Sequence, residues 1–178
     1  VDVRKLSRLL AREHEGEDVF RVVRVPPEEA EVERLLPRQL KALKKQRTRI
    51  TNRIQARLFA EGVVLDPRGG SFRAQTFLKE LSQALRWDGS PLPAGLVYMV
   101  RQDWAQYCLV EEQIRDLAQR QRRALRRARE GDPEATPAQR KAALLTELRG
   151  IGDVGAYVLT TELFGWRVFN NRKEVGAI

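Results

Sequence analysis

The chain is poor in the residue types that most often build disulfides, metal sites and catalytic centres. Its 178 residues include one cysteine, Cys108, and one histidine, His14. A single cysteine excludes an intramolecular disulfide framework and is typical of a reducing compartment such as the cytoplasm. The sequence also lacks a cysteine–histidine cluster for zinc, a glycine-rich phosphate loop and a serine nucleophile elbow. We therefore interpret His14 as an ordinary surface group and Cys108 as a core thiol.

Long apolar runs are lacking as well. No stretch approaches the ~18–20 apolar residues that a membrane-spanning helix needs, and residues 1–6 are too polar for a secretory signal. We therefore expect a cytoplasmic protein without a membrane partner. The chain does not begin with Met, and residues 170–178 have the pattern of a helix that has only begun, capped by Asn170 or Asn171. Both features predict a fragment of a longer protein.

Acidic residues are missing from two segments that are dense in basic ones. The formal net charge is +9, and residues 38–60 contain eight basic residues while residues 120–129 contain six. Neither segment contains an acid, although an exposed helix usually balances Lys and Arg with Glu one turn away. Nucleic-acid phosphates would neutralise such a surface and give binding that depends on salt and not on base sequence. The first segment supplies these candidate contacts: Lys44, Lys45, Arg47, Arg49, Asn52, Arg53 and Arg57.

Apolar residues recur every three or four positions in two long segments, as they do on one side of a helix. The first predicted helix begins at Pro27 and ends before Gly62, with Pro37 as a point where it could kink or split. The second covers about 93–129. Matching seams predict coiled-coil-like packing, either as an antiparallel hairpin in one chain or as a seam that joins subunits of a homo-oligomer. The first seam is expected to contain Leu36, Leu40, Leu43, Arg47, Ile50, Ile54 and Leu58.

The remaining segments are shorter. Residues 1–14 predict a short helix, and the β-branched residues within 19–25 predict a strand. Residues 65–95 form a looser segment, and residues 131–137 have the glycine and prolines of a linker. Together these patterns predict a mainly α fold dominated by long coiled-coil-like helices.

The most distinctive motif is Leu-Arg-Gly-Ile-Gly-Asp-Val-Gly-Ala at residues 148–156. It has the form of a helix-hairpin-helix turn, in which Gly150 and Gly152 let the chain reverse at positive φ and Ile151 fills the gap between two helices. A helix that begins near Asp153 would present bare N–H groups and the positive end of its dipole to a phosphate. The alternative is an ordinary helix–helix turn with a glycine cap. The residues expected near the phosphate are Arg149, Gly150, Gly152 and Gly155.

Three segments, in this order, resemble one family: the bacterial insertion-sequence transposases with a RuvC-like domain and an Asp-Glu-Asp-Asp tetrad, also termed bridge-RNA-guided recombinases. Residues 2–10, Asp-Val-Arg-Lys-Leu-Ser-Arg-Leu-Leu, are similar to the stretch that begins at the last tetrad Asp. Residues 22–62, and above all residues 47–54 with Leu58 and Gly62, resemble the family's Arg-x-x-Leu-x-Asn-Arg-x-x-x-x-Leu helix. Residues 148–172, which end in Phe-Asn-Asn-Arg, resemble the start of its C-terminal transposase domain and add Arg172 as a contact.

The resemblance implies three parts along the chain. Residues 1–34 would be the remnant of the RuvC-like α/β domain, residues 35–130 a helical coiled-coil and basic region, and residues 138–178 the truncated start of the transposase domain. It also implies a bacterial cytoplasmic protein that performs DNA strand exchange guided by a structured RNA, with a serine nucleophile and with Mg²⁺ held by the tetrad.

Only one group of that machinery has a counterpart in this sequence, Asp2, which would be the last tetrad carboxylate and a Mg²⁺ ligand. On its own, Asp2 is an ordinary N-terminal helix cap, and Val3 stands where the family has Ala. The other tetrad members and the serine would lie outside the sequence. We therefore expect this chain to bind DNA and a guide RNA, to lack catalysis and to hold no Mg²⁺ by itself.

Two other functions are compatible with the sequence. One is a non-enzymatic helix-hairpin-helix module that binds nucleic acid, whose gene would encode no acidic tetrad upstream. The other is a basic coiled-coil assembly protein, which would have no affinity for DNA or RNA at low salt.

Overall fold

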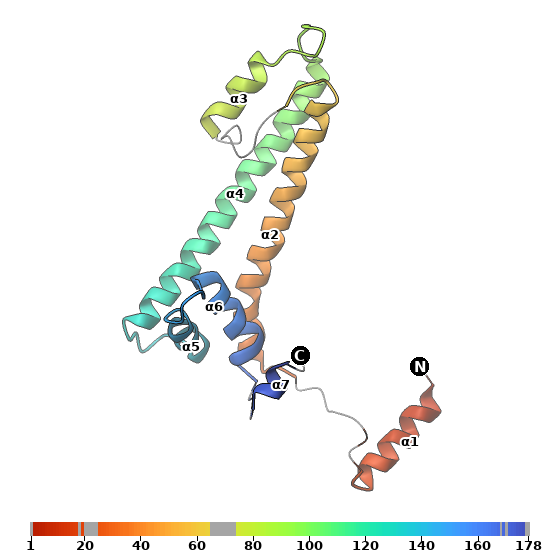
Figure 1. Cartoon of the computed structure of the whole chain (residues 1–178), viewed down its shortest axis with the longest axis vertical. Coiled ribbons are helices and arrows are strands. Elements are labelled where there is room, and N and C mark those ends of the chain that lie inside the picture. The colour runs from red at the N-terminus through yellow and green to blue at the C-terminus, as the bar shows by residue number, and fades with distance from the viewer. Residues whose placement is uncertain are drawn as a thin grey trace.

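The computed structural model describes residues 2–17, 19, 25–64, 74–167, 169 and 171–176. Apart from one isolated bridge between Leu85 and Pro91, the regular elements in these ranges are helical (Figure 1), which confirms the mainly α fold. The strand predicted over 19–25 falls largely outside the described residues. The elements are α1 (Val3–His14), α2 (Glu28–Phe59), α3 (Ala74–Gln83), α4 (Ala94–Arg129), α5 (Pro137–Leu145), α6 (Asp153–Leu159), the π-helical turn η1 (Thr160–Phe164) and α7 (Arg172–Gly176).

The two long helices, α2 and α4, lie side by side and antiparallel, as the orange and green ribbons of Figure 1 show. Their seams therefore meet within one chain, which is the first of the two predicted arrangements. Helix α2 runs continuously through Pro37, which is buried and does not split it. The predicted seam residue Arg47 lies at the edge of the seam, with its side chain 40% exposed. The buried seam contains Leu40, Leu43, Ile50, Ile54 and Leu58 from α2 and Val100, Trp104, Val110 and Ile114 from α4.

The segment predicted to be loose, residues 65–95, contains a packed helix in its described part. Phe77 of α3 is fully buried, and its ring stacks on Trp104 of α4 with the ring centroids 3.9 Å apart. Trp104 in turn stacks on Tyr107 at 4.9 Å. Burial of large aromatic surfaces stabilises a helix that is too short to form alone. Helix α3 is therefore held against α4 at Trp104.

A buried carboxylate joins the two long helices near the end of the hairpin at which α2 finishes and α4 begins. Asp103 of α4 is 5% exposed. Its Oδ1 accepts hydrogen bonds from Arg53 Nε at 2.9 Å and Arg53 Nη2 at 2.6 Å, and its Oδ2 accepts one from Arg57. About two turns further along α4, Glu111 pairs with Arg47 at 2.9 Å. These pairs connect residues on facing helices and follow the antiparallel register.

A second core forms at the C-terminal end of α4. It contains Leu125 of α4, Ala142 of α5, and Ala156 and Tyr157 of α6. The predicted linker ends in a capping box, in which Thr136 and Gln139 exchange hydrogen bonds and start α5. Helices α5 and α6, with η1, therefore form a small unit that packs on the hairpin.

Glu162 of η1 ties this unit to α2. Its carboxylate accepts hydrogen bonds from Arg34 Nε at 2.8 Å and from Arg38 Nε at 3.0 Å. Burial by itself would raise the pKa of Glu162, but the hydrogen bonds and charges of Arg38 and Arg34 outweigh it and hold the pKa below its ordinary value. The ionised carboxylate is thus the form that docks the unit.

Replacing Asp103 with Asn should lower the free energy of unfolding by about 2–3 kcal/mol, because Arg53 and Arg57 lose a buried, charged acceptor. Asp116→Asn is the matched control, since Asp116 lies on the same helix and pairs with Arg120 at a side-chain exposure of 55%; it should cost under about 1 kcal/mol. Urea denaturation of both variants measures the difference. Equal losses would show that Asp103 has no special role.

Glu162 should stabilise the protein at neutral pH and lose this effect in acid. Because its pKa is lowered in the folded state, its contribution is complete above the unfolded value of ~4.3 and disappears as the pH falls through the folded pKa. Glu162→Gln should therefore melt below wild type at pH 7, and the gap should close in acid. The exposed control Glu147→Gln should melt like wild type at pH 7. A gap for Glu162→Gln that stays the same as the pH is lowered into strong acid would contradict this.

Candidate nucleic-acid interface

The turn between α5 and α6 contains the motif of residues 148–156 that the sequence predicted to be a helix-hairpin-helix turn. Helix α5 ends at Leu145 and α6 begins at Asp153. Gly150 has φ +93°, which L-residues rarely adopt. Gly152 does not share this conformation: its φ is −85°, and it serves as the N-cap of α6. The chain therefore reverses at one glycine and not at two, because the extended Gly152 already leads into the next helix.

Ile151 is half-buried and packs against the second core.

The outer surface of the turn is bare backbone. A Cβ atom added to Gly150, Gly152 or Gly155 would meet no other group within 4 Å. No side chain caps the first turn of α6, so none competes for the first N–H groups of this helix, which are the groups that a phosphate at a helix N-terminus uses. Asp153 would oppose an anion at this position, but Arg129 binds its Oδ1 at 2.8 Å and balances the charge. Arg149 is exposed.

The basic residues of α2 from Lys41 to Arg57 form two groups, one that is ion-paired with acids of α4 and one that has no carboxylate partner among the described residues. Three predicted contacts lie beside the seam and already have partners: Arg53 and Arg57 bind Asp103, and Arg47 binds Glu111. The missing acids of segment 38–60 are thus supplied by α4. The other group is exposed and has no carboxylate partner in the described part of the chain; we term it the outer-face cations: Lys41, Lys44, Lys45 and Arg49.

The second basic segment is largely paired as well. Arg120 and Arg126 form salt bridges one turn along α4, and Arg127 and Arg129 bind acids in the loop and in α6. Arg122 and Arg123 are exposed and have no ion-pair partner among the described residues.

The other predicted site residues lie apart from this surface in sequence and in role. Asp2 is the N-cap of α1, and its Oδ1 accepts a hydrogen bond from the Arg4 N–H at 3.1 Å. In the described ranges, no three His, Cys, Asp or Glu side chains gather where they could hold a metal ion. Asn52 of α2 is exposed, and Arg172 begins α7 after a cap formed by Asn171. Burial raises the pKa of the Cys108 thiol, which fits an unreactive core position.

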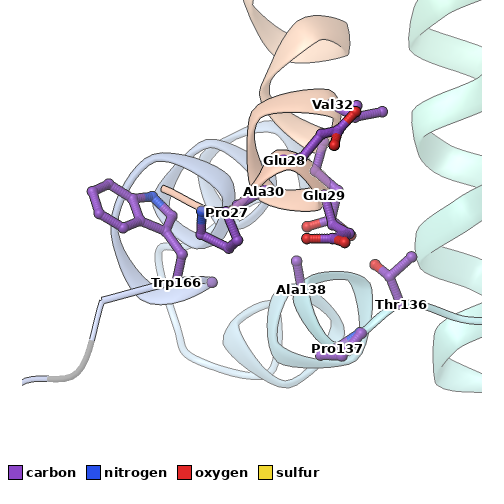
Figure 2. A pocket seen from close by; sticks show the side chains of 11 residues that line it. Pro27, Glu28, Glu29, Ala30, Val32, Thr136, Pro137, Ala138 and Trp166 are labelled. Atoms are coloured by element: carbon purple, nitrogen blue, oxygen red, sulfur yellow. The ribbon is translucent and has the colours of Figure 1, made fainter. Parts of the chain in front are cut away.

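Two hollows lie along α2, one at its first turns and one near its middle, and they differ in charge. The first, of about 740 Å³, lies between the first turn of α2, the start of α5 and Trp166 (Figure 2). Glu28, Glu29 and Glu33 line it, so it would repel phosphate. The second, of about 690 Å³, lies where α2, α4 and α6 meet and is lined by three of the outer-face cations. We term it the three-helix groove; sequence reasoning missed it, because its residues come from three separate segments.

Comparison with known proteins gives a sequence match to a curated relative. The chain is 34% identical to a protein of Sinorhizobium fredii (strain NBRC 101917 / NGR234) named "Putative transposase y4rJ", over 180 aligned positions. The match covers 99% of this chain but 44% of the relative, so the chain spans less than half of that protein's length. No family profile and no solved structure matches. No helix in the described ranges is both long and apolar enough to cross a membrane. The chain is thus similar, over nearly its whole length, to part of a protein named as a transposase.

Proposed function

We propose that this chain is part of a transposase and that it binds DNA through the outer-face cations of α2 and the turn between α5 and α6. The name of the Sinorhizobium relative supports the first half of the proposal. One observation carries the second half: on α2, the arginines beside the seam are ion-paired, whereas Lys41, Lys44, Lys45 and Arg49 face outward with no carboxylate partner in the described structure.

Four like charges at spacings of three and four residues repel one another along a helix. In this arrangement the repulsion has no compensating acid among the described residues, so a bound polyanion would relieve it. A row of this kind contacts the phosphate backbone and not the base edges, which gives affinity without strong sequence preference. The bare backbone of the Gly150–Gly152 turn supplies a second contact of the same chemistry.

The family resemblance extends this proposal to the longer protein. There, the reaction would be DNA strand exchange guided by a structured RNA, with Asp2 as one of the Mg²⁺ ligands. In the structure the Asp2 carboxylate caps α1, and the other Mg²⁺ ligands of the proposed site would come from other parts of the longer protein. The residues of this chain support binding, and the chemical step would need groups from elsewhere in the protein.

Replacing Lys44 and Lys45 with Gln should weaken binding to DNA of any sequence. If both contact phosphates, the slope of log K against log salt should become shallower by about 2, at ~0.9 per contact. The matched control is Arg120→Gln with Arg126→Gln, which removes the same charge from cations already paired with acids. Fluorescence anisotropy with a DNA duplex at several salt concentrations measures both. Equal weakening by the two variants would reduce the effect to net charge and contradict the proposed surface.

Gly152→Ser tests the turn separately. Any residue tolerates φ −85°, and serine is a strong N-cap, so α6 should be retained. The serine hydroxyl would accept hydrogen bonds from the N–H groups that would otherwise bind a phosphate. DNA affinity should therefore fall severalfold. Gly95→Ser is the control, since Gly95 is also in open space. A Gly152→Ser variant that binds DNA like wild type would remove the turn from the interface.

A further inference from the structure

The three-helix groove combines apolar walls with a basic rim. Pro37 and Leu40 of α2 line it together with Val154 and Val158 of α6. Its volume of about 690 Å³ lies within the roughly 300–1,000 Å³ of small-ligand sites. A phosphate alone would gain nothing from such walls, so the groove fits a ligand that joins an apolar body to negative charge.

The charges around the groove favour an anionic ligand. Lys41, Lys44 and Lys45 line it and have no carboxylate partner among the described residues. Glu162 also lines it, but its carboxylate binds Arg34 and Arg38 and is therefore neutralised.

Gln121 of α4 adds a polar group deep in the same groove. It lines the hollow, yet it is only 2% exposed. Its amide Nε2 is buried and has no hydrogen-bond partner among the described residues. Buried amides are nearly always hydrogen-bonded, so a partner brought by a ligand would complete this position.

We propose that the three-helix groove receives one unstacked base of a nucleic-acid strand, while the phosphates on either side of it lie on Lys41, Lys44 and Lys45. This inference rests on the DNA-binding function proposed above and adds a base-binding subsite to it. A nucleobase has flat apolar faces that fit between the aliphatic walls, and each base carries acceptor or donor atoms on its edge for the Gln121 amide. A fully paired duplex keeps its bases stacked and cannot offer one. The groove therefore favours bulged or single-stranded segments.

The test uses the full 178-residue chain and two DNA hairpins that differ in one group. The first carries a single bulged thymidine, and the second carries an abasic analogue at the same position, so the two have equal phosphate charge. Wild type should bind the bulged base about three- to tenfold more tightly than the abasic probe, as stacked bases contribute in other single-strand sites.

Two variants assign that preference to the groove. Gln121→Met removes the amide but keeps the side-chain length, and Val158→Phe narrows the hollow from an exposed position (39%). In both, the ratio of the two affinities should fall toward one. The melting temperature of Gln121→Met should not drop, because its amide nitrogen has no partner to lose among the described residues. Gln113→Met, at an exposed site on the same helix, should keep the wild-type ratio.

The outcomes separate the two proposals. If wild type binds both probes equally, or if both groove variants keep the preference, the base-binding subsite is wrong while phosphate binding stands. An acidic helical peptide that binds the groove in place of the bulged base would also overturn it. If neither probe binds at low salt, the DNA-binding function fails, and the subsite with it.

Discussion

The ion pairs at Asp103 constrain everything that α2 can present to its surroundings. A carboxylate that is 5% exposed needs charged partners, since an unpaired buried charge is strongly destabilising. Arg53 and Arg57 provide them, one turn apart on α2. Because each residue turns the helix by about 100°, fixing these two side chains fixes the rotation of the whole helix. The apolar seam then faces α4, and the outer-face cations stay exposed outside the seam.

The C-terminal unit is attached by the same kind of contact. Glu162 accepts hydrogen bonds from Arg34 and Arg38, so α6 and η1 lie against the first half of α2. The direction of α6 is set by the left-handed Gly150 and by Ile151, which packs into the second core. The three-helix groove lies between two points of attachment. The turn holds the start of α6, and Glu162 of η1, which directly follows α6, binds α2; between them Val154 and Val158 of α6 line the groove.

The helices could be predicted from the sequence, and their charge partners could not. Regular apolar spacing gave α2 and α4 nearly to the residue, and glycine and isoleucine in the 148–156 motif gave the turn. The pairs Arg53–Asp103 and Arg47–Glu111 join residues 50 and 64 positions apart. The spacing of residues within one helix cannot predict contacts between residues so far apart in the sequence. The same limit applies to Gln121, whose place in the groove depends on three segments that meet only in the folded chain. The roles of Asp2 and of the nucleic-acid contacts stay predictions.

The eight basic residues of segment 38–60, which has no acid of its own, thus fall into two sets with different roles. Arg38, Arg47, Arg53 and Arg57 are neutralised by acids from α4 and η1, and their charge contributes to folding. The other four cations keep their charge at the surface, and three of them line the three-helix groove, a hollow that is both apolar and basic. A nucleic-acid strand has the same division, with charge on its backbone and apolar faces on its bases. The structure therefore matches such a strand in two properties at once, whereas a merely basic helix would match it in one.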